Sequence, residues 1–298
     1  MDTDRLPFRP AVLLGAELLS EAMTFLKAHC DLHITADIDP LCFGKHHAAI
    51  TTLSQKLDAQ FFEALPAKHK LKIIANYAVG YDNIDIEAAQ AHGIWVSNTP
   101  DVLTEATAEL AITLLLSLCR RVVAGDRWVK TGTWTGWSPT QLLGHGLKDK
   151  ILGIVGAGRI GQATAALAKA HGMQIYYTAR APKQDFEQRT GAVYRPLEML
   201  CQQADMLSIH LPGSPATHHL FDSTLLRSMK PGTYLVNTGR GSVIDEQALI
   251  ACLQDGHLAG AALDVFEREP HVPKALRLIP QVILTPHIGS ATREARLA

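Results

Sequence analysis

The chain has 298 residues, of which 47% are hydrophobic and 19% charged, and its formal net charge at pH 7 is −1. This length and composition allow a sizeable buried core and predict two domains. Because no basic stretch or face stands out, the net charge argues against a nucleic-acid partner and against an acidic-surface partner.

The five cysteines are odd in number, widely scattered and without a C-x-x-C pair. They predict reduced, mostly buried thiols in a reducing compartment. No metal site is expected. The first residues contain no apolar signal region, and the longest apolar run, Leu110 to Cys119, is too short to span a bilayer. We therefore expect a cytoplasmic protein with no membrane partner.

Short apolar runs alternate with helical spacing over the first hundred residues. Such alternation predicts a parallel sheet with helices on both faces, and hence a small α/β domain. The expected strands are 11–14, 32–35, 48–53, 71–75 and 94–96, and the expected helices are 17–28, 58–65 and 85–92.

A long helix is expected next, from about Thr104 to Ala124. Between Ala111 and Cys119 it is apolar on nearly every side, so it should lie between layers, domains or subunits, and we interpret it as the first crossing between domains. The following Trp-rich segment, 132–139, is expected to be a loop. Exposed tryptophans there would need a partner to cover them, unless both side chains fold back onto their own domain.

The most informative stretch reads KILGIVGAGRIGQ, in which an apolar strand breaks into G-x-G-x-x-G and an Ala-rich helix. Gly156 permits the tight turn, Gly158 lets the backbone approach a pyrophosphate, and Gly161 lets the helix pack closely on the strand. The first amides of the helix, from Arg159 and Ile160, would face the anion at the positive end of the helix dipole. The stretch predicts a dinucleotide site.

The cofactor type depends on the end of the next strand, 173–177. NAD sites of this kind usually place Asp or Glu about 20 residues after the glycines, to bind the ribose hydroxyls. This chain has Thr178, Ala179 and Arg180 there. Thr178 and Arg180 can donate to a 2′-phosphate, so NADP(H) is favoured and NAD(H) remains possible; the alternative is that Arg180 is a solvated loop residue.

Three polar residues follow later strand-like runs, at or near the ends where ligands bind in parallel sheets. Arg240 has a planar fork suited to a carboxylate. His287 can give a proton to a carbonyl oxygen, and Glu269 beside it would stabilise the charged imidazole and orient it. Singly, they could be a surface turn arginine, a solvated glutamate and a loop histidine. The further strands are expected at 206–210, 234–237, 259–263 and 282–284.

The order Arg, Glu, His after a dinucleotide motif resembles the D-isomer-specific 2-hydroxyacid dehydrogenases, from about residue 48 to residue 298. Among these, the chain is most similar to the glyoxylate/hydroxypyruvate reductases, through TEATAE at 104–109, WTGWSP at 134–139 and the loop at 178–180. The segments that carry the family resemblance are AVGYDNID at 78–85, LGIVGAGRIG at 152–161, NTGRGSV at 237–243, ALDVF at 262–266 and PHIGS at 286–290.

The resemblance implies two doubly wound parallel-sheet α/β domains. A flavodoxin-like substrate domain would comprise residues 1–98 with 287–298, and a Rossmann cofactor domain would comprise residues 99–286. Members of the family usually continue for several helical turns beyond Ser290, so the C-terminal part of the substrate domain is expected to be short in a chain that ends at Ala298.

The resemblance also implies NADPH-dependent reduction of glyoxylate or hydroxypyruvate to glycolate or D-glycerate by a homodimer. Arg240, Glu269 and His287 would be catalytic. The substrate would contact Leu53, Val79, Gly80, Arg240 and Trp137, with Trp137 reaching across a two-fold dimer into the neighbouring active site. The implied cofactor-binding residues are Thr104, Gly156, Gly158, Arg159, Ile160, Gly161, Thr178, Ala179, Arg180, His210, Leu211, Pro212, Thr217, Thr238, Gly239, Asp264 and Gly289.

Other functions are open on the same scaffold, including another D-2-hydroxyacid dehydrogenase or a non-catalytic nucleotide-sensing protein. Formate dehydrogenases resemble the family but lack the glutamate partner, and phosphite dehydrogenases carry a lysine in the loop that here contains Val79. Glyoxylate and hydroxypyruvate differ by one CH₂OH group, which a pocket discriminates by only about 1 to 3 kcal/mol, so the sequence leaves the preferred substrate open.

Overall fold

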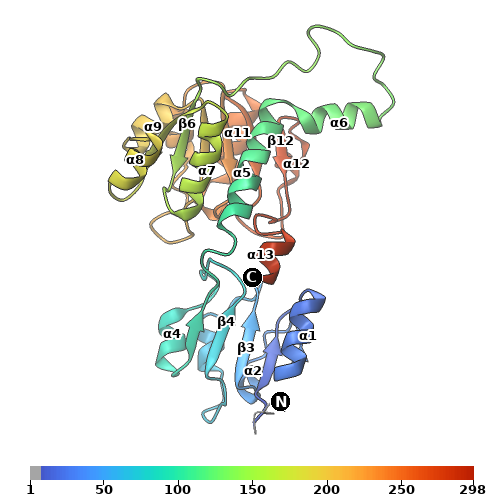
Figure 1. The fold of residues 1–298 in the computed structure, drawn as a ribbon, viewed down its shortest axis with the longest axis vertical. Coiled ribbons are helices and arrows are strands. Elements are labelled where there is room, and N and C mark those ends of the chain that lie inside the picture. Colours follow the sequence, from blue (N-terminus) through green and yellow to red (C-terminus); the bar gives the residue numbers. More distant parts are fainter. Residues whose placement is uncertain (1–7) are drawn as a thin grey trace, which may run out of the picture. The chain divides into compact units, whose positions relative to one another are not determined.

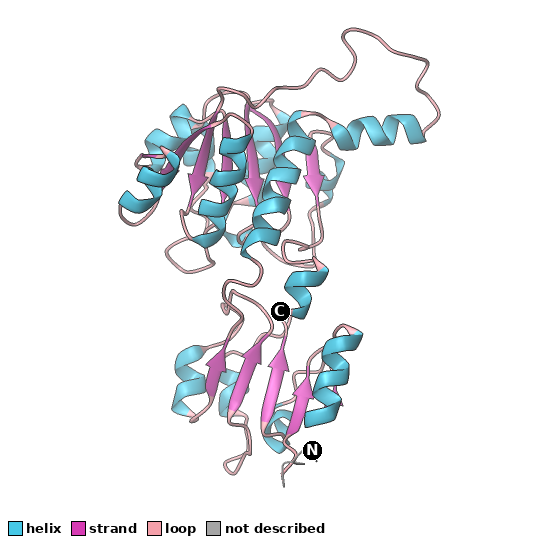
Figure 2. Ribbon diagram, in the orientation of Figure 1, coloured by secondary structure: helices cyan, strands magenta, loops and turns pink. Residues whose placement is uncertain are grey.

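The computed structural model describes residues 8–298. The chain divides into two compact units, each with its own parallel sheet (Figures 1 and 2). Unit 1 comprises Met1–Leu103 and Thr292–Ala298, and unit 2 comprises Thr104–Ala291. Within the described range, none of the helices combines the length and the apolar character that crossing a membrane requires.

Unit 1 is built on a five-stranded sheet in the order β2-β1-β3-β4-β5, with every pair parallel. This is the flavodoxin-like order, which confirms the fold predicted for the first part of the chain. The strands are β1 (Ala11–Leu14), β2 (Asp31–Ile34), β3 (Ala48–Thr51), β4 (Ile73–Asn76) and β5 (Trp95–Ser97), and the helices are α1 (Ser20–His29), α2 (Pro40–Lys45), α3 (Ala59–Glu63), α4 (Ile86–Ala91) and α13 (Arg293–Leu297).

Helix α2 is absent from the sequence prediction. Its start carries two local signals, because Asp39 accepts a hydrogen bond from the amide of Leu41 and Pro40 occupies the first helical position. Its six residues are too few to show helical periodicity. The helix contributes Phe43, which is fully buried in the core of unit 1, so its formation depends on tertiary packing.

The C-terminal helix α13 belongs to unit 1. The hydroxyl of Tyr77 donates to the carbonyl oxygen of Arg296, and the Arg296 guanidinium lies 5.8 Å from the centre of the Tyr77 ring. Arg293 forms an ion pair with Glu21 on α1. These contacts attach the returning chain to elements near the beginning of the sequence.

Unit 2 contains a seven-stranded sheet in the order β12-β11-β10-β9-β6-β7-β8, again with every pair parallel. The order runs outward in both directions from β6 and β9, as in a Rossmann fold, and so creates a switch point between these two strands. The strands are β6 (Ile151–Val155), β7 (Gln174–Thr178), β8 (Val193–Tyr194), β9 (Met206–Ile209), β10 (Thr233–Asn237), β11 (Leu258–Leu263) and β12 (Val282–Leu284).

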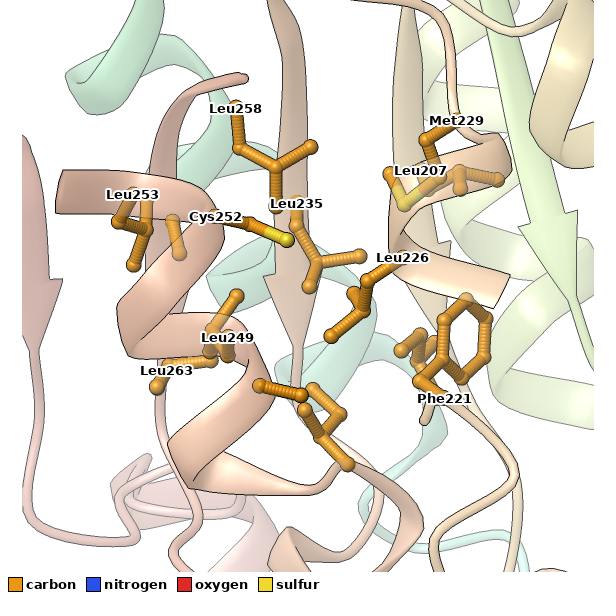
Figure 3. Close-up of a cluster of buried hydrophobic side chains, with 14 of the residues drawn as sticks. Leu207, Phe221, Leu226, Met229, Leu235, Leu249, Cys252, Leu253, Leu258 and Leu263 are labelled. Atoms are coloured by element: carbon orange, nitrogen blue, oxygen red, sulfur yellow. The ribbon is translucent and has the colours of Figure 1, made fainter. Parts of the chain in front are cut away.

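Two hydrophobic clusters cover the two faces of this sheet. One lies beneath α5 (Thr104–Cys119), α7 (Arg159–Ala170) and α8 (Gln184–Thr190). The other, shown in Figure 3, packs Leu235 of β10 among fully buried residues such as Phe221 and Leu249. Its helices are α9 (Leu197–Gln203), α10 (Ser223–Ser228), α11 (Glu246–Gln254) and α12 (Lys274–Leu278).

The predicted continuous helix from Thr104 to Ala124 is wrong at its end, because α5 stops at Cys119 and α6 (Val122–Lys130) begins after a break. Arg121 is left-handed at the break, with φ of 54°. The carbonyl oxygen of Cys119 accepts the amide of His145 at 2.9 Å. Gly144 lets the chain approach, since a Cβ there would lie 2.1 Å from the same oxygen. The returning loop therefore caps the C-terminal end of α5. The helical pattern of the sequence does not predict this contact.

Helix α6 and the loop after it project from unit 2 (Figure 1). None of the residues of α6 is buried in this chain. The side chains of Trp134 and Trp137 are 47% and 79% exposed, which excludes the alternative that both fold back onto their own domain.

Candidate active site

The glycine-rich loop between β6 and α7 has the geometry that a dinucleotide requires. Gly156 has φ of +96°, and a Cβ there would meet the backbone of His210 at 3.0 Å. A Cβ on Gly161 would lie 2.3 Å from the carbonyl oxygen of Gly156, so helix and loop are in close contact. Around Gly158, by contrast, no atom lies within 4 Å of the Cβ position. The open position is the one where a pyrophosphate must approach the backbone.

Helix α7 begins directly after this open position. Gly158 is its N-cap and offers no side chain to its first amides. The dipole of a 12-residue helix places partial positive charge there. The loop therefore fits an extended diphosphate in both shape and charge.

The loop after β7 is connected to the glycine loop, because the amide of Gly156 donates to the carbonyl oxygen of Thr178 at 3.1 Å. Arg180, two residues further, is exposed. The buried Tyr177 shapes this loop: its hydroxyl accepts the amide of Lys183 at 2.6 Å and donates to Glu187 at 2.8 Å. Sequence reasoning missed Tyr177, whose only signal was a tyrosine in an otherwise apolar strand.

Two loops meet beside the switch point, after β9 and after β10. A Cβ on Gly239 would lie 2.7 Å from the carbonyl oxygen of Leu211. The imidazole of His210 lies 2.9 Å from Ser208 Oγ and 3.4 Å from Thr238 Oγ1. Burial lowers the pKa of His210 to about 4, so this imidazole is neutral at physiological pH.

The remaining expected cofactor residues lie at loop or helix ends. Thr217 donates to the carbonyl oxygen of Pro212 at 2.7 Å and so closes the loop after β9. Thr104 is the first residue of α5. Thr107, one turn later, donates to the carbonyl oxygen of Gly289 at 3.1 Å, which attaches the start of α5 to the segment after His287.

Glu269 and His287 form the predicted pair. His287 Nδ1 lies 2.7 Å from Glu269 Oε2, while the amide of Phe266 donates to Glu269 Oε1 at 3.0 Å. Burial favours the neutral carboxyl, but the hydrogen bonds from His287 and Phe266 outweigh it and hold the pKa of Glu269 below its ordinary value. The charge of Arg240 acts in the same direction, so Arg240 lies within electrostatic range of Glu269.

The position of His287 depends on Asp264. The backbone of His287 is left-handed, with φ of 54°, and its amide donates to the carbonyl oxygen of Asp264 at 2.9 Å. The Asp264 carboxylate accepts the amides of Ile288 and Gly289, each at 2.8 Å, and the hydroxyl of Thr285 at 2.7 Å. Burial raises the pKa of Asp264 despite these donors. Sequence reasoning assigned Asp264 to the cofactor and missed this positioning role.

Arg240 is placed by a turn that Asn237 organises from the end of β10. Asn237 Oδ1 accepts the amide of Gly239 at 3.0 Å, and its Nδ2 donates to the carbonyl oxygen of Arg240 at 2.9 Å. Gly241 packs on the backbone of Phe266, because a Cβ would lie 1.9 Å from its carbonyl carbon. Sequence reasoning included Asn237 in the NTGRGSV motif but gave it no role of its own. It is a buried amide at the end of a strand.

The expected substrate loop of unit 1 follows β4. Two side-chain amides fix the backbone of this loop. Asn98 donates to the carbonyl oxygen of Val79 at 2.9 Å, and Asn76 donates to that of Gly80 at 2.8 Å. Asn76 is buried, and sequence reasoning missed it. Leu53 is half-buried just after β3. These residues belong to unit 1, whereas Arg240, Glu269, His287 and Trp137 belong to unit 2.

Comparisons with known proteins agree with this geometry. The family model for the NAD binding domain of D-isomer specific 2-hydroxyacid dehydrogenases matches residues 112–289. The glyoxylate reductase of Thermococcus litoralis is 51% identical over 253 residues, which cover 84% of this chain and 76% of that protein. The glyoxylate reductase of Aeropyrum pernix is 44% identical over 301 residues, covering 97% of this chain and 89% of that protein.

Among solved structures, an NADPH-dependent glyoxylate/hydroxypyruvate reductase from Sinorhizobium meliloti, in complex with NADP and malonate, superposes with a TM-score of 0.86. It is 35% identical, with 97% of this chain and 89% of that chain covered. Fold and family match together define a dehydrogenase with an NAD-binding domain. The chain belongs to the D-isomer specific 2-hydroxyacid dehydrogenase family, which confirms the resemblance drawn from its motifs.

The glycine geometry predicts opposite outcomes for two alanine substitutions. Gly158→Ala is expected to change the unfolding free energy by less than about 1 kcal/mol, because its Cβ enters open space, yet to weaken dinucleotide binding strongly. Gly161→Ala is expected to lower Tm, because its Cβ collides with backbone. Thermal unfolding and fluorescence titration with NADH and NADPH check both. Equal losses of Tm would contradict this division of roles.

Proposed function

We propose that this protein reduces glyoxylate or hydroxypyruvate to glycolate or D-glycerate, with NADPH as the preferred reductant. The observation that carries the proposal is the pair of His287 and Glu269, joined at 2.7 Å, with Arg240 in electrostatic range. An acid with a charged partner and an arginine are the groups that a 2-oxo carboxylate needs. The similarity to named glyoxylate reductases supports the substrate class.

In this proposal, Arg240 binds the substrate carboxylate through two parallel donors. The dihydronicotinamide supplies the hydride that the carbonyl carbon accepts. His287, whose Nδ1 faces Glu269, gives the proton on Nε2 to the carbonyl oxygen. Hydride and proton together convert the 2-oxo acid to the 2-hydroxy acid. Glu269 keeps the imidazole oriented through its bond to Nδ1.

The preference for NADPH rests on the loop after β7. It holds Thr178 and the exposed Arg180, with no acidic residue at the position that would repel a 2′-phosphate. The named relative from Sinorhizobium meliloti is NADPH-dependent. The five cysteines are all free, in keeping with the reducing cytoplasm that we propose as its compartment.

A steady-state panel of small 2-oxo acids tests the proposed activity, with NADPH and NADH each followed by nicotinamide absorbance. Glyoxylate or hydroxypyruvate is expected to give the highest kcat/KM, and NADPH is expected to exceed NADH. Formate and phosphite, each supplied with NADP⁺ or NAD⁺ as the hydride acceptor, are the control substrates and should not be oxidised. A higher kcat/KM for a bulkier 2-oxo acid would overturn the substrate assignment, and no turnover with any would favour a non-catalytic nucleotide sensor.

Arg180→Ala is expected to raise the KM for NADPH by about ten- to a hundredfold, the loss expected for one hydrogen bond to a charged group, while the KM for NADH changes little. Arg277→Ala is the matched control, because Arg277 is an exposed arginine on α12. Equal effects on the two cofactors would show that Arg180 does not recognise the 2′-phosphate.

The rate of reduction is expected to fall on the acid side only below the ordinary carboxyl range, because the lowered pKa of Glu269 keeps the carboxylate that orients His287 ionised down to that range. In Glu269→Gln this acid limb should be absent and kcat should be low at every pH, because the variant has no carboxylate to protonate. The measurement is kcat against pH.

Two further variants complete this test. His287→Gln removes the proton donor and should lower kcat by about 10² to 10⁴ while NADPH still binds. Glu267→Gln removes a carboxylate 3.2 Å from His219 and should leave the acid limb in place. An acid limb that persists in Glu269→Gln, with cofactor binding intact, would mean that Glu269 is not the group that sets it.

We also propose that the projecting segment of unit 2 forms a two-fold homodimer, with Trp137 entering the neighbouring active site. Support comes from the run of exposed apolar side chains along α6 and the following loop. A second copy of the chain would remove them from water, and the hydrophobic effect favours that burial. The exposed residues are Val122, Val129, Trp134, Trp137 and Leu143.

Sedimentation at micromolar concentration checks this assembly. We expect a dimer whose interface buries about 2,000 Å² or more, the range of obligate dimers. Trp137→Ala should also raise the KM for the 2-oxo acid, whereas Trp95→Ala, an exposed tryptophan of unit 1, should not. A monomer at this concentration would refute the dimer.

A further inference from the structure

Three side chains of the types that bind metals converge in unit 1. His33 lies on β2, Cys42 lies on α2, and His46 is the C-cap of α2. One ligand atom from each lies within 4.8 Å of the others. The sequence predicts no metal site, because His33 comes from a different element and the three do not form a recognised spacing.

The distances match those of a tetrahedral ion. Cys42 Sγ lies 3.6 Å from His33 Nδ1. Zinc bonds of about 2.3 Å to sulfur and 2.0–2.1 Å to nitrogen, at a tetrahedral angle, separate the two ligand atoms by about 3.6 Å. The rings of His33 and His46 are adjacent, with centroids 5.2 Å apart. Little movement is therefore needed to enclose an ion.

The second histidine has one ring nitrogen occupied by a backbone hydrogen bond. His46 Nδ1 lies 2.7 Å from the carbonyl oxygen of Cys42, so it carries the hydrogen that this bond requires. The other ring nitrogen, Nε2, is then left with its lone pair. Histidines bound to metals commonly make this backbone hydrogen bond with the nitrogen that does not bind the ion.

The electrostatic surroundings distinguish Cys42 from the other partly exposed cysteine. The negative charges of Asp39 and Asp37 act on Cys42, opposed by Lys45. Cys30 experiences the positive charge of Arg9, opposed by one carboxylate, that of Asp31. Two carboxylates near a thiol favour a cation there.

We propose that His33, Cys42 and His46 bind one zinc ion, with water completing a four-coordinate site. The ion would join the edge strand β2 to helix α2, on the side of unit 1 formed by these two elements. Its role is structural, because none of the three ligands belongs to the catalytic or cofactor-binding sets. The proposal therefore stands independently of the proposed reaction.

Cobalt titration of the full, untagged chain tests the site after treatment with a chelator. A thiolate-to-cobalt charge-transfer band is expected, saturating at one Co²⁺ per chain and displaced by Zn²⁺. Cys42→Ser should abolish the band, and the matched Cys30→Ser should retain it. His33→Gln and His46→Gln should weaken binding at least about tenfold, since even outer-shell changes cost that much. His33 is exposed, so its replacement leaves the core intact.

Thermal unfolding supplies an independent readout. Zn²⁺ should raise the Tm of the wild type and of Cys30→Ser, and should leave that of Cys42→Ser unchanged. Reductase activity should be the same with and without Zn²⁺, which separates this proposal from the proposed function. A charge-transfer band that survives Cys42→Ser, or saturation below one ion per chain, would overturn the site.

Discussion

The buried carboxylate of Asp264 is the constraint on which the candidate active site depends. It accepts two consecutive backbone amides and one hydroxyl from the segment that carries His287, while its own carbonyl accepts the amide of His287. These bonds hold His287 in a left-handed conformation that few residues adopt unaided. In that conformation the imidazole lies 2.7 Å from Glu269. The position of the proposed proton donor, His287, therefore depends on Asp264, which has no chemical role in the proposed reaction.

A second constraint is the close approach of backbone at the carboxyl ends of the strands in unit 2. Gly156, Gly239 and Gly241 each occupy a position where a Cβ would collide with a neighbouring loop. Consequently the glycine loop, the loop after β9 and the turn that carries Arg240 pack against one another or against the segment leading to Glu269. Parallel strands bring these ends to one edge, and the missing side chains let the loops come together there.

Two segments of this chain expose side chains that are usually covered by a partner. Helix α6 and the Trp-rich loop present apolar side chains to solvent, which isolated domains rarely do over a contiguous segment. In unit 1, β2 lies at the sheet edge and carries an exposed histidine beside a half-buried cysteine. In the two proposals, a second copy of the chain would cover the exposed apolar segment, and a cation would bind between the histidine and the cysteine.

The sequence alone predicted the two parallel sheets and the glycine loop with its three distinct glycines. Both predictions depend on short stretches of sequence, namely the alternation of strand-like and helical runs and the conformational freedom of glycine. The residues Arg240, Glu269 and His287 were also identified from the sequence, since each follows a strand-like run and they occur in that order after the dinucleotide motif. Tertiary structure alone decided the end of α5 at Cys119, helix α2, and the holding roles of Asp264, Asn237 and Asn76. The end of α5, helix α2 and the role of Asp264 depend on hydrogen bonds or packing between residues distant in sequence. Asn237 and Asn76 instead bond residues two to four positions away, in turns that the hydrophobic pattern does not predict. The role of a buried polar side chain is defined by its hydrogen-bond partners, and the local hydrophobic periodicity does not show which residues those partners are.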